Sequence, residues 1–330
     1  MWFRSLFGFR ETNGDQVRAN LKLDGNRIAS LANGRSFVWG RLETPKLSDL
    51  RTSAEPHRAT SGRLRVSEVV GDVQQLHQDP ENEGALFQVA SQFNLLEMVA
   101  PSVSPEHGVD GYENDWTQGP ACAIAAGAGT VYRNYFTDVD GQIGQTADRQ
   151  IDCLSDLGAS LGNDRGRLWA MHNGYALATA EGLTEIRERL SSPDESERDA
   201  LRKELRIGVQ WNTEVTLNDT GHLVTQTYNS ALPVAYSSHR AELWEPFATL
   251  VLEASYEATL CAAIVNAAET GNRRVFLTLL GGGAFGNRGE WILSAAKRAL
   301  RTVEDCGLDV SFVSFRRSNP DVCELARRFA

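Results

Sequence analysis

Glycines near the C-terminal end of the chain are spaced so that their backbone could bind phosphate. The segment 274–289 reads RVFLTLLGGGAFGNRG. Residues 275–280 are apolar and β-branched enough to form a buried strand, and the apolar residues after Asn287 recur at helical spacing. Glycine N–H groups between a strand and a helix can point into one concavity, where the helix start adds partial positive charge. The pattern therefore predicts a diphosphate-binding loop made of Gly281, Gly282, Gly283, Ala284, Phe285, Gly286 and Asn287.

Two other interpretations of this loop stay open. A tight turn that binds nothing would use the same residue types. Gly281, Gly283 and Gly286 also match G-x-G-x-x-G, the dinucleotide fingerprint of nicotinamide-dependent oxidoreductases. That fingerprint follows the first strand of its domain, whereas here only one helix and one strand, 308–315, remain. The loop thus belongs to the last strand but one of an α/β sheet, and an oxidoreductase is the weaker alternative.

Composition and charge limit the kinds of partner. With 330 residues, 42% of them hydrophobic and 23% charged, the chain can bury a full globular core. Its formal net charge of −10 disfavours nonspecific binding to nucleic acid or to an anionic membrane. An anionic ligand must therefore be held by a local site, and we expect neither nucleic acid nor membrane as a partner.

Cysteine and histidine usage indicates the compartment and argues against metal chemistry. The five cysteines are scattered and lack C-x-x-C spacing, which suggests neither a disulfide framework nor a zinc site. The N-terminus MWFRSLFGFR lacks the apolar core of a signal peptide, and no apolar run approaches eighteen residues. No Ser or Cys lies in a nucleophile elbow, and the six histidines are dispersed. We expect a cytoplasmic protein without metal or cofactor.

The remaining pattern predicts one α/β domain with an extension. Residues 1–62 are expected to form an N-terminal extension packed on a main domain of 63–330. Hydrophobic periodicity and turn signals predict strands over 64–76 and 85–93, a helix over 120–131, a strand or hairpin edge over 168–179 with its turn at Asn173-Gly174, a surface helix pair over 184–205, antiparallel strands over 205–217 and 224–236, and a buried helix over 243–268.

One long loop stands out between the second strand and the first helix. Residues 101–119 read PSVSPEHGVDGYENDWTQG and mix carboxylates, aromatic residues and glycines. A loop that only connects two elements need not be so long or carry amphipathic aromatic side chains. We therefore predict that this loop is functional.

Four features together resemble macrodomains, in macrodomain order. They are Gly71-Asp72-Val73 at the end of one strand, Asn94 at the end of the next, the loop 108–119, and the glycine loop. GGGAFGN is most similar to the phosphate loop of the poly(ADP-ribose) glycohydrolase branch. The resemblance covers residues 64–316 and implies a three-layer α/β/α fold with a mixed central sheet. Where that branch has two adjacent glutamates for acid–base chemistry, this chain has Gln118-Gly119-Pro120.

By this resemblance the ligand is ADP-ribose. Asp72 would accept a hydrogen bond from the adenine amino group, Asn94 would meet the distal ribose, and the backbone of 282–286 would hold the diphosphate. The other implied ligand-binding residues are Gln118 and Gly119 in the first loop, Phe285 over the phosphates or ribose, and Phe315 stacked on adenine.

Carboxylates near the distal ribose would carry any chemistry. Cleavage at the anomeric carbon needs a protonated leaving group and an aligned water, and both tasks suit carboxylates. The candidates are Asp110 and Asp115 in the loop and Glu214 in the strand region, with Glu113 and Asp219 as further possibilities. We predict a hydrolase that releases ADP-ribose from ADP-ribosylated protein. Arginine is the preferred linkage because several carboxylates suit a guanidinium leaving group. The alternative is a noncatalytic reader of ADP-ribosylated partners.

Overall fold

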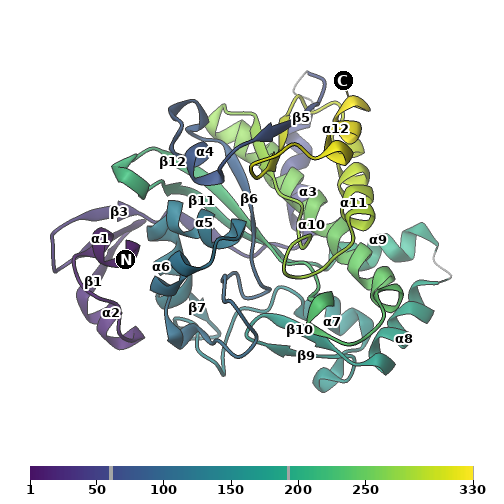
Figure 1. Ribbon diagram of the computed structural model, residues 1–330, viewed down its shortest axis with the longest axis horizontal. Coiled ribbons are helices and arrows are strands. Elements are labelled where there is room, and N and C mark those ends of the chain that lie inside the picture. The colour runs from purple at the N-terminus through teal and green to yellow at the C-terminus, as the bar shows by residue number, and fades with distance from the viewer. Residues whose placement is uncertain (59–61, 192–193, 330) are drawn as a thin grey trace.

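A seven-stranded mixed sheet forms the centre of the molecule (Figure 1). The computed structural model describes residues 1–58, 62–191 and 194–329. Strands β12, β6, β13, β14 and β5 run parallel to one another, whereas β11 is antiparallel to both of its neighbours. The strand order is β4 (Arg41–Glu43), β11 (Gly208–Glu214), β12 (Leu223–Asn229), β6 (Leu86–Ala90), β13 (Arg274–Leu277), β14 (Asp309–Ser314) and β5 (Arg65–Val70).

Helices flank this sheet, as predicted for an α/β fold with a mixed central sheet. One group consists of α10 (Ala241–Thr270), which contacts β6, β12 and β13, together with α3 (Leu47–Ala54) and α11 (Gly289–Arg301). A second group consists of α4 (Val73–Gln78), α5 (Gln118–Ala125) and α6 (Gly127–Tyr135), of which α5 contacts β6 and α6 contacts β11. Because β6 is covered by helices, its residues 86–89 are all buried.

Helix α10 is the long apolar helix predicted over 243–268. It spans 30 residues and ends at Gly271, whose left-handed φ of 79° lets the chain turn away. Among the described residues it is the one helix long and apolar enough to cross a membrane, but 83% of its most apolar window is buried within the protein. Its composition is therefore accounted for by its position in the core.

Smaller elements complete the main domain. The hairpin predicted over 168–179 is confirmed, and the helix pair lies against α10 (Figure 1). These elements are β7 (Asp138–Val139), β8 (Gln142–Ile143), α7 (Ser155–Leu161), β9 (Trp169–His172), β10 (Tyr175–Ala178), α8 (Ala180–Leu190), α9 (Glu195–Lys203) and α12 (Pro320–Arg327).

The N-terminal residues form a separate layer that contacts α6. It contains α1 (Trp2–Phe7), α2 (Gly14–Asn20) and a three-stranded sheet of β1 (Leu21–Asp24), β2 (Arg27–Ser30) and β3 (Ser36–Val38). Its apolar residues share a second core with the segment after β6 and with α6. We predicted a boundary after residue 62, but β4 and α3 join the main sheet and the main core. The separate layer therefore ends before β4.

Several predicted elements differ from the structure. The strand expected over 64–76 ends at Val70, and residues 73–78 form α4. The helix expected over 120–131 is two helices, α5 and α6, with a break at Ala126, where ψ is 59°. The strand expected over 224–236 ends at Asn229, and its last residues form a 3₁₀ turn, Val234–Tyr236. Helix α12 follows the last strand, and Asn319 caps it with a side chain that accepts from Asp321 N.

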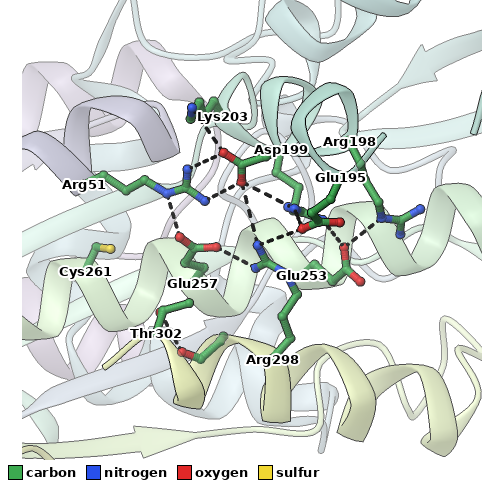
Figure 2. Close-up of polar contacts among 12 residues, drawn as sticks. Arg51, Glu195, Arg198, Asp199, Lys203, Glu253, Glu257, Cys261, Arg298 and Thr302 are labelled. Atoms are coloured by element: carbon green, nitrogen blue, oxygen red, sulfur yellow. Dashed lines mark hydrogen bonds and ion pairs between the residues drawn. The ribbon is translucent and has the colours of Figure 1, made fainter. Parts of the chain in front are cut away.

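An ion network joins four helices at the outer side of α10 (Figure 2). The carboxylate of Glu257 in α10 accepts hydrogen bonds from Arg51 of α3 and Arg298 of α11, both at 2.6 Å. Arg51 also donates two bonds of 2.8 Å to Asp199 of α9. Burial by itself would raise the pKa of Glu257, but the two arginines lower it below its usual range. The network therefore stabilises the folded state while Glu257 is ionised.

We expect Glu257→Gln to lower the free energy of unfolding by about 2–4 kcal/mol at pH 7, because two arginines lose a buried partner. Urea denaturation measures this, and Glu195→Gln, at the exposed rim of the same network, should cost less than about 1 kcal/mol.

The pH dependence follows from the lowered pKa of Glu257. Its contribution is fully present above the unfolded-state pKa of 4.5 and is lost as the pH falls through the folded-state pKa. The difference between the parent and Glu257→Gln should therefore shrink below about pH 4. A difference that is constant down to pH 3 would contradict an ionic role.

Candidate active site

A cavity lies at the carboxyl ends of β6, β12 and β13. Open α/β sheets bind ligands at this edge. The enclosed space is about 180 Å³, so it holds only part of a nucleotide-sized ligand, and the rest must extend through the open mouth. The residues that line it include Ala90, Gln92, Glu97, Met98, Val99, Asp115, Thr117, Gln118, Gly119, Tyr175, Tyr236, Thr278, Gly281, Gly283, Ala284 and Phe285.

The cavity exists because β13 separates from β6. These strands pair only at Val275 with Leu86 and at Phe276 with Phe87. Beyond this point the side chain of Gln118 replaces the missing strand: its Nε2 donates to Gln88 O at 2.7 Å, and its Oε1 accepts from Ala90 N at 2.9 Å. We predicted Gln118 as a ligand-binding residue. It does line the cavity, and its amide also fixes the start of α5 to β6.

The glycine loop contributes unpaired backbone N–H groups to the cavity. The predicted order of strand, loop and helix is confirmed by β13 and α11. Within the described part of the chain, no hydrogen bond is formed by the N–H groups of Gly281, Gly283, Ala284 and Phe285, and these four residues line the cavity. The N–H groups of Gly282 and Gly286 instead donate to Leu279 O and Gly283 O, each at 3.0 Å. The N–H groups of Gly281 and of the consecutive residues Gly283, Ala284 and Phe285 are therefore available as hydrogen-bond donors, which suits an anionic ligand.

Two positions in this loop require glycine for structural reasons. Gly281 has a φ of 75°, and a Cβ there would lie 2.3 Å from the Cβ of Ala231. Gly286 has a φ of 70°, and a Cβ there would lie 2.8 Å from the Cβ of Ala235. A Cβ at Gly283 would meet nothing within 4 Å. Gly283 is thus the position at which a side chain can be added without disturbing the fold.

Three aromatic rings form one wall of the cavity. The ring centroid of Tyr175 is 5.3 Å from that of Phe285 and 5.2 Å from that of Tyr236. The hydroxyl of Tyr175 donates to Met98 O at 2.6 Å, which ties β10 to the segment after β6. Phe285 therefore lines the cavity, on a wall suited to the flat face of a sugar or base.

Two carboxylates line the cavity. Asp115 is partly exposed, and its Oδ1 accepts from Thr117 N at 2.9 Å, which shapes the turn before α5. Glu97 is buried, and both of its carboxylate oxygens lie near Arg133 Nη2, at 3.3 and 3.5 Å. Burial raises the pKa of Glu97 above its usual range, although Arg133 opposes this shift. Of the predicted catalytic residues, the structure thus brings Asp115 to the cavity.

The other predicted carboxylates face the N-terminal layer. Asp110 lies beside Glu11, which accepts from Asp110 N at 2.6 Å, and burial raises the pKa of Asp110. Glu113 binds the terminal amine of Met1 at 2.8 Å. Glu214 accepts from Val38 N at 2.7 Å. None of these three side chains lines the cavity, and the N-terminal layer provides the partners of Glu113 and Glu214.

Asp219 likewise forms an ion pair with Arg35 of the N-terminal layer and lies outside the cavity lining. It therefore joins Glu113 and Glu214 as a carboxylate whose partner comes from that layer.

Several predicted ligand-binding residues also lie outside the cavity lining. Asp72 caps α4, where its Oδ1 accepts from Gln74 N at 2.8 Å. Asn94 is fully buried and its amide is bonded to Gln150 and Leu96.

Two more residues that were predicted to bind ligand, Asn287 and Phe315, also lie outside the cavity lining. Asn287 is buried and donates to Leu232 O at 2.8 Å. Phe315 is 56% exposed beside Arg316.

One carboxylate of the cavity, Glu97, was not predicted, although the sequence contained a signal for it. Glu97 is a lone carboxylate in the apolar segment Leu95 to Val99, and charged residues are seldom buried without a specific role. Tyr175 and Tyr236 had no such signal, because only the folded chain brings their strand and turn to the glycine loop. Among the described residues, no group of three or more His, Cys, Asp or Glu side chains is placed to hold a metal ion.

Comparison with known proteins shows that the chain is similar to several solved structures. No family model and no curated protein matches the chain. It is similar to poly(ADP-ribose) glycohydrolase from Deinococcus radiodurans in complex with ADP-ribose, with 13% identity and a TM-score of 0.47 over 88% of this chain and 92% of that one. It is also similar to the Thermomonospora curvata glycohydrolase, with 13% identity and a TM-score of 0.44 over 92% and 94% of the two chains. The same enzyme bound to the inhibitor ADP-HPD gives 15% identity and a TM-score of 0.42 over 92% and 93%.

We expect Gly119→Ala to destabilise the protein by at least about 2 kcal/mol, because the new Cβ would lie 2.0 Å from Ala90 O. Thermal unfolding measures this. Gly111→Ala, in the same loop, is the control, since a Cβ there meets nothing within 4 Å. Equal melting temperatures for the two variants would show that α5 does not pack against β6 as closely as described.

Proposed function

We propose that this protein is an ADP-ribosyl hydrolase that cleaves the bond between ADP-ribose and a protein side chain. One observation carries the proposal: unpaired N–H groups of the glycine loop and the carboxylates of Asp115 and Glu97 line the same cavity at the carboxyl edge of the sheet. The first feature suits a diphosphate and the second suits acid–base chemistry at a sugar carbon. The sequence resemblance to macrodomains gives ADP-ribose as the ligand that combines the two.

The polarity of the cavity supports this ligand. Its described lining includes two carboxylates and no Lys, Arg or His. A diphosphate there would depend on backbone N–H groups rather than on basic side chains, which is what the glycine loop offers. The three aromatic rings would contact the ribose or the base.

The carboxylates also support a cationic leaving group. A guanidinium gains a charge-assisted hydrogen bond from the Asp115 carboxylate and a further acceptor in the Glu97 carboxyl group, which a neutral serine or glutamate ester linkage would not make. We therefore propose ADP-ribosyl-arginine as the preferred substrate and ADP-ribosylated protein as the partner, in the cytoplasm. The position of the glycine loop after β13, the last strand but one, continues to disfavour the oxidoreductase.

We expect Gly283→Val to weaken ADP-ribose binding at least tenfold without lowering the melting temperature. Its side chain would occupy open space beside the unpaired N–H groups and block the approach of a phosphate. Isothermal titration calorimetry with ADP-ribose measures the affinity. Gly289→Val, at the start of α11 and outside the cavity lining, is the control, and equal affinities for the two variants would refute phosphate binding by this loop.

We expect Asp115→Asn to retain ADP-ribose affinity but to lower the rate of ADP-ribosyl release at least a hundredfold, the usual scale for loss of a general acid or base. Release from arginine-, serine- and glutamate-linked substrates measures the rate. Asp110→Asn should turn over at the parental rate, because Asp110 faces the N-terminal layer. If the parent binds ADP-ribose but releases it from no linkage, the protein is a reader instead.

A further inference from the structure

Glu97 lines the cavity but lies in the segment that follows β6, not in the loop 101–119. It follows β6 by seven residues and is 3% exposed. The backbone on its C-terminal side is fixed twice: Met98 N donates to Gln92 Oε1 at 2.7 Å, and Met98 O accepts from the Tyr175 hydroxyl at 2.6 Å. Glu97 N donates to the hydroxyl oxygen of Tyr112 at 3.0 Å. The side chain therefore leaves a well-anchored backbone.

The absence of a side chain at Gly119 makes room for Glu97. A Cβ at position 119 would lie 3.1 Å from the Cγ of Glu97 and 2.0 Å from Ala90 O. Glu97 thus packs directly over the backbone at the start of α5. Gln118 on one side of this glycine and Pro120 on the other both line the cavity, as does Glu97. Glu97 therefore places a carboxyl group beside the start of α5, where the loop 101–119 itself has none.

The contact with Arg133 leaves the Glu97 carboxyl group able to hold a proton. Charge-assisted hydrogen bonds between a guanidinium and a carboxylate are usually 2.7–2.9 Å long, whereas Arg133 Nη2 lies 3.3 and 3.5 Å from the two oxygens. Arg133 is instead engaged by Leu95 O at 3.0 Å and by Tyr228, over whose ring its guanidinium lies at 3.7 Å. Arg133 is thus held mainly by partners other than Glu97.

We propose that Glu97 is the general acid of the reaction, which protonates the leaving group, and that Asp115 is the base that activates water. This assignment rests on the proposed hydrolase function. Burial raises the pKa of Glu97, which agrees with a group that carries a proton near neutral pH. Asp115, partly exposed at the mouth, has access to water.

The reaction balances with water alone as co-reactant. The Glu97 carboxyl gives its proton to the leaving nitrogen while the bond between that nitrogen and the anomeric carbon breaks. A water oxygen bonds to the anomeric carbon, and the proton that it releases goes to the Asp115 carboxylate. The products are ADP-ribose and the free side chain, and exchange with solvent returns a proton to Glu97 and removes one from Asp115.

The test compares two leaving groups in Glu97→Gln. With ADP-ribosyl-arginine, whose nitrogen must be protonated, we expect kcat to fall at least a hundredfold while ADP-ribose affinity stays within about threefold of the parent. With ADP-ribose linked to p-nitrophenol, which leaves as a stable anion, we expect a loss of less than about tenfold. The parent rate on the arginine substrate should also decline at high pH, and this decline should be absent in the variant.

Control variants distinguish a role of Glu97 as general acid from a purely structural role. Glu106→Gln, a glutamate of the long loop outside the cavity lining, should match the parent on both substrates. If Glu97→Gln does not fold, Glu97→Asp keeps a carboxyl group beside Arg133 but shortens its reach, and it should show the same contrast between leaving groups. Equal losses on both substrates would assign Glu97 a structural role. If the parent protein is active and Glu97→Gln is equally active, Glu97 is not the general acid, but the hydrolase function stands. If the parent protein releases ADP-ribose from no linkage, both the acid role of Glu97 and the hydrolase function are refuted.

Discussion

The parting of β13 from β6 is the constraint on which the candidate site depends. Strands in a sheet must pair their backbone groups, and a strand that loses its neighbour needs replacement partners. The side chain of Gln118 supplies these partners on β6, while Gln88 accepts from Thr278 N at 3.3 Å and so holds the chain that leaves β13. Two glutamine side chains thus keep the gap open, and the start of α5 and the glycine loop face each other across it.

The N-terminal layer determines which carboxylates are available for chemistry. Glu11 accepts from the N–H groups of Val109 and Asp110 and from the Tyr135 hydroxyl, so the layer holds the long loop at its middle. Asp110 and Glu113 of the loop face this layer, and Asp115, which follows them, reaches the cavity. The extension is therefore part of the structure that positions the site, rather than an addition to a complete domain.

Local sequence patterns predicted much of the fold. Apolar periodicity located the central strands, and glycines after a β-branched run located the loop, because both signals depend on neighbours along the chain. Residue roles were harder to predict, because they depend on packing between distant segments. Asp72 lies two residues after the end of β5, and the carboxylate that was predicted to bind adenine caps α4 instead. Glu97 enters the cavity because Gly119, on another element, leaves space for it.

A crystal structure of the protein in complex with ADP-ribose would locate the ligand relative to the glycine loop and the two carboxyl groups. We expect the diphosphate within hydrogen-bond distance of the N–H groups of Gly283, Ala284 and Phe285, with the anomeric carbon of the distal ribose between Asp115 and Glu97. ADP-ribose bound away from the glycine loop, or a distal ribose that contacts neither carboxylate, would contradict this expectation.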